Sequence, residues 1–429
     1  MRISTNTIYD AGTSGLVRQS SDLFRTQQQL STGKRVLAPS DDPVASATAL
    51  EIDQIKAIND QQAVNRRDAT SAIGFAESQI STAGDLLASI RERIIQAGNG
   101  AMSDTDLKSI ATDIRGSFSG LMGVANSRDA FGDFLFSGYR SNTQPFAGSI
   151  EAGVTYAGDD GQREAQVGSS RRLPISDPGS DVFMRMRTGN GQFTMAPNAA
   201  NTGSAVSDLG SVTDGVAWNA TSNGGSFKVV FNVTNNVTTY DIVDNTSGNS
   251  LLTGAAPGAA PYPRTYVEGD SITLASQGAE PPFDLGARFS ITGKPASGDS
   301  FSLDRSATQS VFETIGDVVK ALEAGTNGNP AAIARLNNAL SAGLGNIDQA
   351  QEGLLTVRSR MGARASEVQA LDALGSDVDL QFQTQLSQLR DVDYTSAISR
   401  LTQQQTYLQA AQQSFLKVSG LSLFNFIGG

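Results

Sequence analysis

Apolar residues recur every seven positions along two stretches of this chain, a spacing typical of α-helices that pack at shallow angles. The columns of the first stretch are Ile73, Ile80, Leu87 and Ile94 with Ala76, Ala83, Ile90 and Ala97, followed by Leu107, Ile114 and Leu121. Gly98-Asn99-Gly100 should end the helix that carries the first of these columns, and Ser103 or Asp104 could cap the helix that follows. The second columns are Ile333, Leu340, Ile347, Leu354, Met361 and Val368 with Leu336, Ala350, Val357 and Leu371. We interpret these segments as a helical bundle.

Both ends of the chain carry columns of their own. They consist of Tyr9, Leu16, Leu23 and Leu30 near the start, and Tyr394, Leu401, Leu408 and Phe415 near the finish. No charged residue lies between Arg400 and Lys417, so neighbours could cover this helix on every side without burying an unpaired charge. We therefore predict that the terminal helices pair with each other and with copies from other molecules, and that these eight residues form the assembly interface. A flexible polar tail is the alternative, but sustained heptads favour packing.

Two short segments interrupt the helical pattern. The apolar column changes phase at Asp391-Val392-Asp393, which indicates a bend or a change of partner. Ala38-Pro39-Ser40-Asp41-Asp42-Pro43 is the corresponding place near the start, where Ser40 or Asp41 could cap the following helix. We interpret both segments as hinges between a terminal layer and the bundle.

The middle of the chain has a different composition. Ten of the 13 prolines lie between Pro145 and Pro295, among many Gly, Asn, Thr and Ser residues. The run 226–234 predicts a strand, and Asp160-Gly161 between 154–156 and 164–167 predicts a hairpin. We expect Trp218 to anchor the core of a small β domain rather than to stack on a sugar.

These patterns predict an α+β multidomain protein, in which an elongated heptad-patterned bundle formed by the N- and C-terminal segments carries an inserted, mainly β domain. The hairpin near 153–168 could belong to the insertion or to the bundle. The predicted domains are a terminal coiled-coil layer (1–40 with 391–429), a helical bundle (41–140 with 305–390) and a β-rich insertion (141–304).

The charge balance and two missing residue types restrict the function. Forty-three acidic against 32 basic residues give a net charge of −11, which argues against nucleic-acid binding. The chain has neither histidine nor cysteine, so a catalytic triad, a thiolate nucleophile and ordinary zinc or haem sites are excluded. We expect no enzyme activity, no cofactor and no metal.

The remaining candidates for chemistry are weak. Asp159 and Asp160 near Glu164 could hold a cation or act as paired carboxylates, although adjacent acids before a glycine are more typical of a turn. Asp241, Asp244 and Asn245 lack the spacing of a calcium loop. The phosphate-loop pattern fails because Gln28 and Arg288 occupy the position of its first glycine.

The sequence shows no sign of secretion through a cleaved leader. Its first residues lack an apolar core followed by a cleavage site, and no stretch of about 20 apolar residues could span a bilayer. A protein exported without a cleaved signal would have the same features.

The two ends resemble a known family. The segments concerned are Met1-Arg2-Ile3-Ser4-Thr5-Asn6, Gln29-Leu30-Ser31-Thr32-Gly33-Lys34-Arg35-Val36, Ser40-Asp41-Asp42-Pro43-Val44-Ala45, Phe134-Leu135-Phe136-Ser137-Gly138-Tyr139, Gln144-Pro145-Phe146, Ala397-Ile398-Ser399-Arg400-Leu401 and Leu421-Ser422-Leu423-Phe424-Asn425-Phe426. They are similar to the hook–filament junction members of the bacterial flagellin family.

This resemblance implies an extracellular structural subunit of the bacterial flagellum, exported by the flagellar type III apparatus. It implies a homo-oligomeric ring that joins the first hook-associated protein to the flagellin filament, and an export chaperone on the C-terminal segment. Two alternatives are flagellin itself and an adhesive protein that binds glycans through the β insertion. Neither nucleic acid nor a membrane is expected as a partner.

Overall fold

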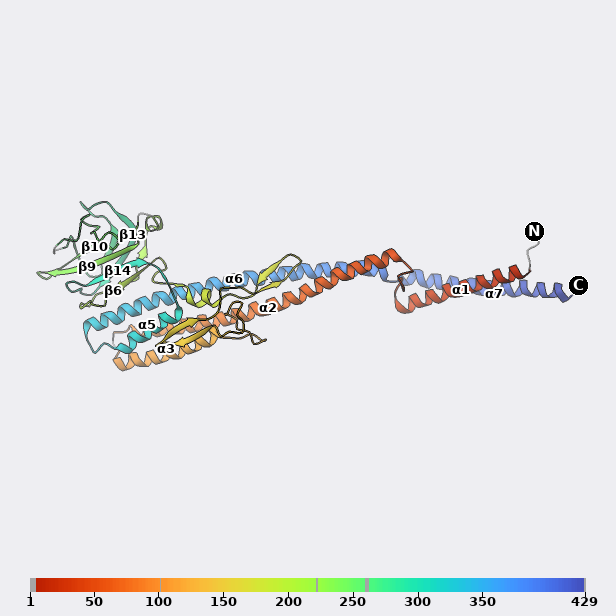
Figure 1. Ribbon diagram of the computed structural model, residues 1–429, viewed down its shortest axis with the longest axis horizontal. Helices are drawn as coiled ribbons and strands as arrows, with labels where there is room; N and C mark the ends of the chain where they lie inside the picture. The colour runs from red at the N-terminus through yellow and green to blue at the C-terminus, as the bar shows by residue number, and fades with distance from the viewer. Residues whose placement is uncertain (1–4, 101, 221–222, 259–261, 428–429) are drawn as a thin grey trace. The chain divides into compact units, whose positions relative to one another are not determined.

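The computed structural model describes residues 5–100, 102–220, 223–258 and 262–427. Long helices at both ends of the chain flank a mainly β middle region, which confirms the predicted α+β class (Figure 1). The helices are α1 (Thr5–Thr32), α2 (Pro43–Ala97), α3 (Asp104–Ala125), the π-helix η1 (Ser180–Met184), α4 (Gly215–Trp218), α5 (Val311–Ala324), α6 (Pro330–Arg390) and α7 (Tyr394–Ile427).

The strands lie between α3 and α5, and all of their pairings are antiparallel. They are β1 (Phe146–Ser149), β2 (Gly153–Tyr156), β3 (Glu164–Gln166), β4 (Arg172–Pro174), β5 (Met186–Arg187), β6 (Phe193–Pro197), β7 (Val206–Ser207), β8 (Ser211–Val212), β9 (Ser226–Thr234), β10 (Val237–Asp244), β11 (Arg264–Thr265), β12 (Ser271–Ala275), β13 (Asp284–Thr292), β14 (Ser300–Arg305) and β15 (Thr308–Gln309). The predicted strand at 226–234 is confirmed as β9.

The chain divides into two compact units. The first unit contains residues 1–66, 167–170 and 369–429, and so holds α1, α7 and the neighbouring ends of α2 and α6. The second unit contains 67–166 and 171–368, with the rest of α2 and α6, α3, α5 and the strands.

Heptad columns of α2, α3 and α6 form the helical core of the second unit. All eight predicted α2 positions from Ile73 to Ala97 are buried, and so are the three predicted in α3. The antiparallel course of α2 and α6 in this unit is evident from two salt bridges, Glu77 to Arg358 and Arg91 to Asp348. Ser103 caps α3, and Asp106 completes a capping box with it. These buried columns confirm the predicted bundle.

One position of the α6 column was predicted wrongly. Ile333 is 39% exposed, although Leu340 and every later member of its column are buried. Ile94 of α2 lies next to Gly343 of α6, and α2 ends three residues further on at Ala97. Because the helices are antiparallel, the first turn of α6 extends past the end of α2, so α2 does not cover Ile333.

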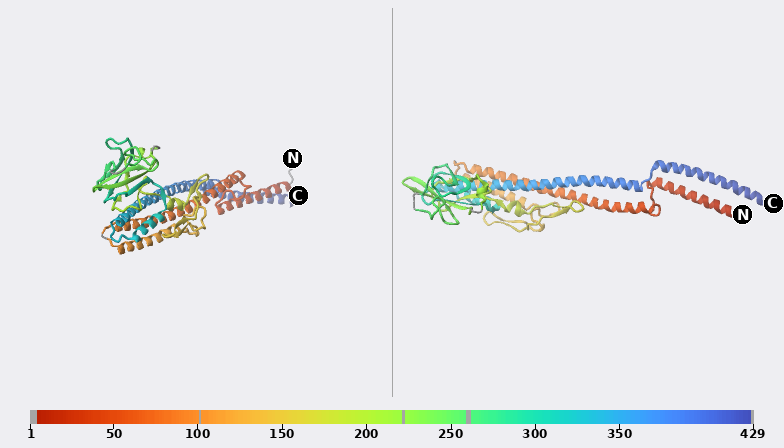
Figure 2. Two further views of the ribbon diagram at one scale, coloured as in Figure 1. Left: turned by 60° about the vertical axis from the view of Figure 1, so that its left-hand side comes forward. Right: turned by 90° about the horizontal axis from the view of Figure 1, so that it is seen from above.

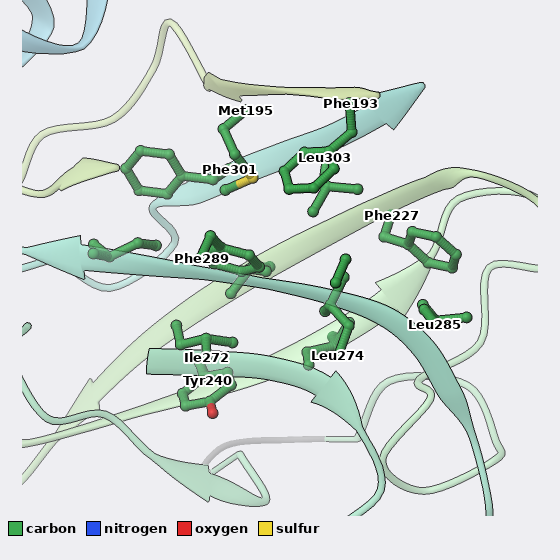
Figure 3. Packing of buried hydrophobic residues seen from close by; sticks show 14 of the residues in the cluster. Phe193, Met195, Phe227, Tyr240, Ile272, Leu274, Leu285, Phe289, Phe301 and Leu303 are labelled. Carbon is green, nitrogen blue, oxygen red and sulfur yellow. The ribbon is translucent and has the colours of Figure 1, made fainter. Parts of the chain in front are cut away.

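The β region encloses a separate apolar core between two sheets. Strands β11, β10, β9, β14 and β6 are neighbours in one sheet, and β12, β13 and β7 are neighbours in the other, with β8 also pairing with β13. Figure 3 shows side chains from both sheets meeting, among them Phe301, Phe289 and Ile272. Trp218 is only 1% exposed and packs on Phe193 with 5.3 Å between ring centroids. The prediction of a core anchor is confirmed, and this burial leaves no free indole face for a sugar.

The hairpin predicted around Asp160-Gly161 is wrong. Strand β2 pairs with β1, and β3 pairs with β4, so the two strands that flank Asp160 do not pair with each other. Asp160 instead accepts hydrogen bonds from Ser180 and Arg185, while Asp159 accepts them from the amides of Tyr139 and Gly161. These tertiary bonds hold the segment in a connecting loop, which local turn signals could not reveal.

Candidate assembly interface on the terminal helices

Helices α1 and α7 form an antiparallel pair in the first unit (Figures 1 and 2). Near their outer ends, the rings of Tyr9 and Phe415 lie 5.1 Å apart. Gly12 lies against the same phenyl ring, because a Cβ at this position would be 2.7 Å from Phe415 Cδ2. At the other end, the amide of Val392 donates to the carbonyl of Gly33. The pair therefore stays in contact from one end to the other.

The eight residues predicted to form the interface lie in this pair in two environments. Tyr9 and Tyr394 are more than half exposed. Leu16, Leu23, Leu30, Leu401, Leu408 and Phe415 are half-buried. Ala397 of α7 is buried. A half-buried leucine column between two helices leaves apolar surface that a third helix could cover.

A second set of apolar side chains on these helices was not predicted. Val17 and Phe24 of α1 are each about two-thirds exposed and stand seven residues apart, immediately after Leu16 and Leu23. Ile398, Tyr407 and Leu416 of α7 are also exposed, and so is Val418, which the sequence places beside the predicted α7 column. The heptad spacing of Val17 and Phe24 is visible in the sequence, whereas the exposed apolar residues of α7 do not fall in one heptad column. Together the two sets make the pair apolar on more than one side, which is unusual for a solvated helix.

A shallow groove of about 600 Å³ runs between α1 and α7. Its lining includes small residues, Gly12, Gly15 and Ala411, and the larger Leu16 and Phe415.

None of the described helices combines the length and the apolar character that spanning a membrane requires.

The predicted interruptions of the helices are confirmed, and hydrogen bonds join them to each other. Helix α1 ends before Gly33, whose φ is +70°, and α6 ends at Arg390. The amide of Arg35 donates to the carbonyl of Arg390, and its guanidinium donates to the carbonyl of Leu389. We call residues 33–42 with 389–393 the paired break. Its backbone bonds fix how the chain passes between the α1–α7 pair and the ends of α2 and α6.

The cap of α2 differs from the prediction. Neither Ser40 nor Asp41 caps this helix, because Asp42 accepts the hydrogen bond from the amide of Ala45. Pro43 occupies the first helical position, where its missing N–H leaves no donor unpaired, and this places the cap one residue later than predicted. Asp41 instead accepts from the amides of Leu37 and Ala38, each at 3.0 Å.

These bonds lower the pKa of the Asp41 and Asp42 carboxyl groups. The amides of Ala38 and Leu37, helped by Arg25, hold the pKa of Asp41 below its usual value of 3.8. The amide of Ala45 and the Arg35 guanidinium act in the same way on the pKa of Asp42. A carboxyl group whose pKa is lower in the folded chain stabilises the fold when ionised, so its contribution is complete above the unfolded pKa and disappears as the pH falls through the folded one.

We expect acid to loosen the loop at Leu37 and Ala38. As the pH is lowered from 7, the NMR signals of both amides should shift together as Asp41 is protonated, with a midpoint below 3.8. In an Asp41→Asn variant, which keeps an acceptor oxygen but has no charge to lose, the shift should be absent. A midpoint at or above 3.8 would contradict the proposed role of these amides.

The carboxylates of Asp241 and Asp244, the other candidates for chemistry, accept hydrogen bonds within the fold. Asp241 accepts from the amide of Ile242 and the hydroxyl of Ser250, and Asp244 accepts from Thr246 and Ser247. Within the described part of the chain, no cluster of acidic side chains has the arrangement of a metal site. These residues stabilise turns of the β region.

Comparison with known proteins gives consistent matches. The profile of the bacterial flagellin N-terminal helical region matches residues 3–141, and that of its C-terminal helical region matches residues 344–427. The flagellar hook-associated protein 3 of Salmonella typhimurium is 28% identical over 431 residues, which cover 99% of each chain. A crystal structure of FlgL from Xanthomonas campestris is 30% identical with a TM-score of 0.66, and the match covers 78% of this chain and 99% of that one.

Flagellin proper matches a smaller part of the chain. A flagellin of Salmonella derby is 25% identical over 265 residues, which cover 58% of this chain and 48% of that protein. The match to the hook-associated relative spans nearly the whole of both chains and so includes the β region. The resemblance of the chain ends is thus confirmed, although Met1–Ser4 lie outside the described residues. The chain belongs to the bacterial flagellin family, in its hook-associated protein 3 (FlgL) branch of structural flagellar proteins.

Proposed function

We propose that copies of this chain form the ring at the junction of hook and filament, and that they assemble through the half-buried columns of α1 and α7. The supporting observation is the apolar surface that the isolated α1–α7 pair leaves exposed, with Val17, Phe24 and Ile398 among its members. Burial of apolar area contributes about 25 cal/mol per Å², and neighbouring copies supply a partner of matching pattern.

The uncharged length of α7 supports the same proposal. Between Arg400 and Lys417 the helix has no charged side chain, so surrounding copies could bury it without the desolvation of an unpaired ion. The apolar surface of α7 that α1 leaves uncovered would gain stability when further helices pack on it during assembly. The eight predicted residues remain our proposed interface.

The partners follow from the position of a junction. The first hook-associated protein would lie on the hook side and flagellin on the filament side, outside the cell. Before assembly, an export chaperone would cover the C-terminal segment, since that segment presents Leu416 and Val418 to solvent. Export would use the flagellar type III route without a cleaved leader.

Deletion of the gene tests this function. Cells without it should keep complete hooks and release unpolymerised flagellin into the medium, because the filament cannot attach to the hook without the junction. Electron microscopy would count the hooks, and an immunoblot of the medium would measure flagellin. A plasmid copy of the gene should restore filaments. If flagellin is missing from both the medium and the cells, the chain is the filament subunit and the proposal is wrong.

A further inference from the structure

A phenylalanine in the second unit is presented to solvent on a rigid turn. Phe131 is 91% exposed, more than any other large apolar side chain for which exposure is described. Its amide donates to Asp129 Oδ1 at 2.9 Å, and the amide of Asp133 donates to the same oxygen at 3.0 Å. The amide of Asp129 donates to the carbonyl of Asp133, which closes the turn. We call residues 128–133 the Phe131 turn.

Two arginines brace this turn. Arg163 Nη1 lies 3.2 Å from Asp133 Oδ2 and 3.8 Å from Asp129 Oδ2. Arg128 donates to the carbonyl of Gly132 and lies over the ring of Phe134. The turn is therefore ordered before any partner binds, which removes much of the entropic cost of binding. An exposed aromatic side chain on an ordered support is the usual form of an interface anchor.

The first unit contains a pocket that suits such a side chain. It has a volume of about 280 Å³ at the paired break and is lined by Leu37, Ala38, Pro39 and Leu50, among others. For comparison, an apolar cavity of about 150 Å³ can hold benzene. Leu50 is largely exposed, so the pocket continues into open apolar surface. Asp41 fixes its wall through the amides of Leu37 and Ala38. We call it the break pocket.

We propose that the Phe131 turn of one copy inserts into the break pocket of a neighbouring copy. Since Phe131 is almost fully exposed, it occupies no pocket of its own chain. Each chain then offers one anchor and one pocket at different places, and such a heterologous contact repeats from copy to copy around a ring. The inference rests on the proposed function, because it needs copies of the chain to be neighbours.

The charges on both sides are compatible with this contact. Asp129 and Asp133 are paired with Arg163, while Arg390 at the edge of the break pocket is paired with Asp53. These carboxylates and guanidinium groups already have partners within their own chain, so covering them does not bury an unpaired ion. A second copy of the chain supplies both parts of the contact, the exposed Phe131 and the break pocket.

Cysteine cross-linking tests the proposal directly, because the natural chain contains no cysteine. A disulfide needs Cα atoms within about 7 Å of each other. Ala130→Cys, which keeps the neighbouring Phe131 anchor, and Ala38→Cys would be made in separate gene copies and co-expressed in cells that lack the natural gene. After mild oxidation, hook–filament structures would be purified and linked peptides quantified by mass spectrometry. Val216→Cys, at a highly exposed apolar position elsewhere, would replace Ala130→Cys in the control pair.

We expect the A130C and A38C pair to give at least about tenfold more linked peptide than V216C with A38C. Equal linking by the two pairs, with all three variants incorporated, would overturn the inference but leave the proposed function intact. Absence of the natural chain from the junction would overturn both. In a second measurement, Phe131→Ser should reduce incorporation about tenfold or more with an unchanged circular dichroism spectrum, as for an interface anchor. Incorporation equal to that of the natural chain would contradict the anchor.

Discussion

Leu408→Asp should abolish incorporation of the chain into the flagellum while leaving the second unit folded. Leu408 is half-buried in α7, in the column between Leu401 and Phe415. A carboxylate at this position would lose its hydration without gaining a cation, since α7 has no basic residue between Arg400 and Lys417. Burial of an unpaired ion costs several kcal/mol, and about 1.4 kcal/mol is a factor of ten in binding. The number of filaments per cell, counted by electron microscopy, should fall by more than about tenfold.

The same result should be obtained with Leu401→Asp, which lies one heptad earlier in α7. Leu408→Met is the matched control, because it preserves apolar character and approximate volume and should assemble normally. Circular dichroism of the purified variants should resemble that of the natural chain, since the core of the second unit contains no residue of α7. Normal motility of the Leu408→Asp strain, or global unfolding of the protein, would refute this role of the column.

Phe312→Ala should destabilise the second unit by about 3–5 kcal/mol, the usual range for a buried phenylalanine. Phe312 is the second residue of α5 and is almost fully buried. Its ring centroid lies 5.4 Å from that of Phe146, 5.8 Å from that of Phe118 and 5.9 Å from that of Phe183. It therefore joins α5 to α3, β1 and η1, and its removal opens a cavity at their meeting point. Denaturant unfolding followed by circular dichroism would measure the loss.

Phe131→Ala provides a matched control for this experiment. It removes the same atoms from the same unit, but at an exposed site, so the free energy of unfolding should change by less than about 0.5 kcal/mol. The fluorescence of Trp218, the single tryptophan, would report separately on the core of the β region. If Phe312→Ala cost less than about 1 kcal/mol, the aromatic cluster would not hold these elements together.

The predictions that succeeded share a physical basis. Heptad columns such as Ile73 to Ile94 specify a buried face whatever the partner helix is, because a seven-residue repeat keeps one side of a helix apolar. The end of the helix before Gly98 follows from local backbone preferences. Trp218 was placed in the core because a large aromatic residue among short strands has few other stable positions.

The predictions that failed depended on partners remote in sequence. The local pattern places Asp160 in a hairpin, yet Ser180 and Arg185 hold it in a loop. Ile333 fits its column, but α2 ends before reaching it. In both cases a segment distant in sequence decides the outcome against the local pattern.

Arg66 is the clearest case in which segments distant in sequence decide the environment of a residue. It lies within a helical segment of ordinary composition, and nothing near it in the sequence indicates a buried charge. In the first unit it is only 3% exposed, donates to Asp372 and to the carbonyl of Val167, and lies where a side chain at Gly375 would overlap it.

The sequence by itself determined the periodic helices, their interruptions, the β character of the middle region and the absence of histidine and cysteine chemistry, because these depend on local spacing and composition. Only the tertiary structure decided which strands pair, how the two interruptions bond to each other, and that Phe131 faces solvent while Arg66 does not. Those outcomes depend on contacts between segments tens to hundreds of residues apart, and a single sequence carries no record of such distances.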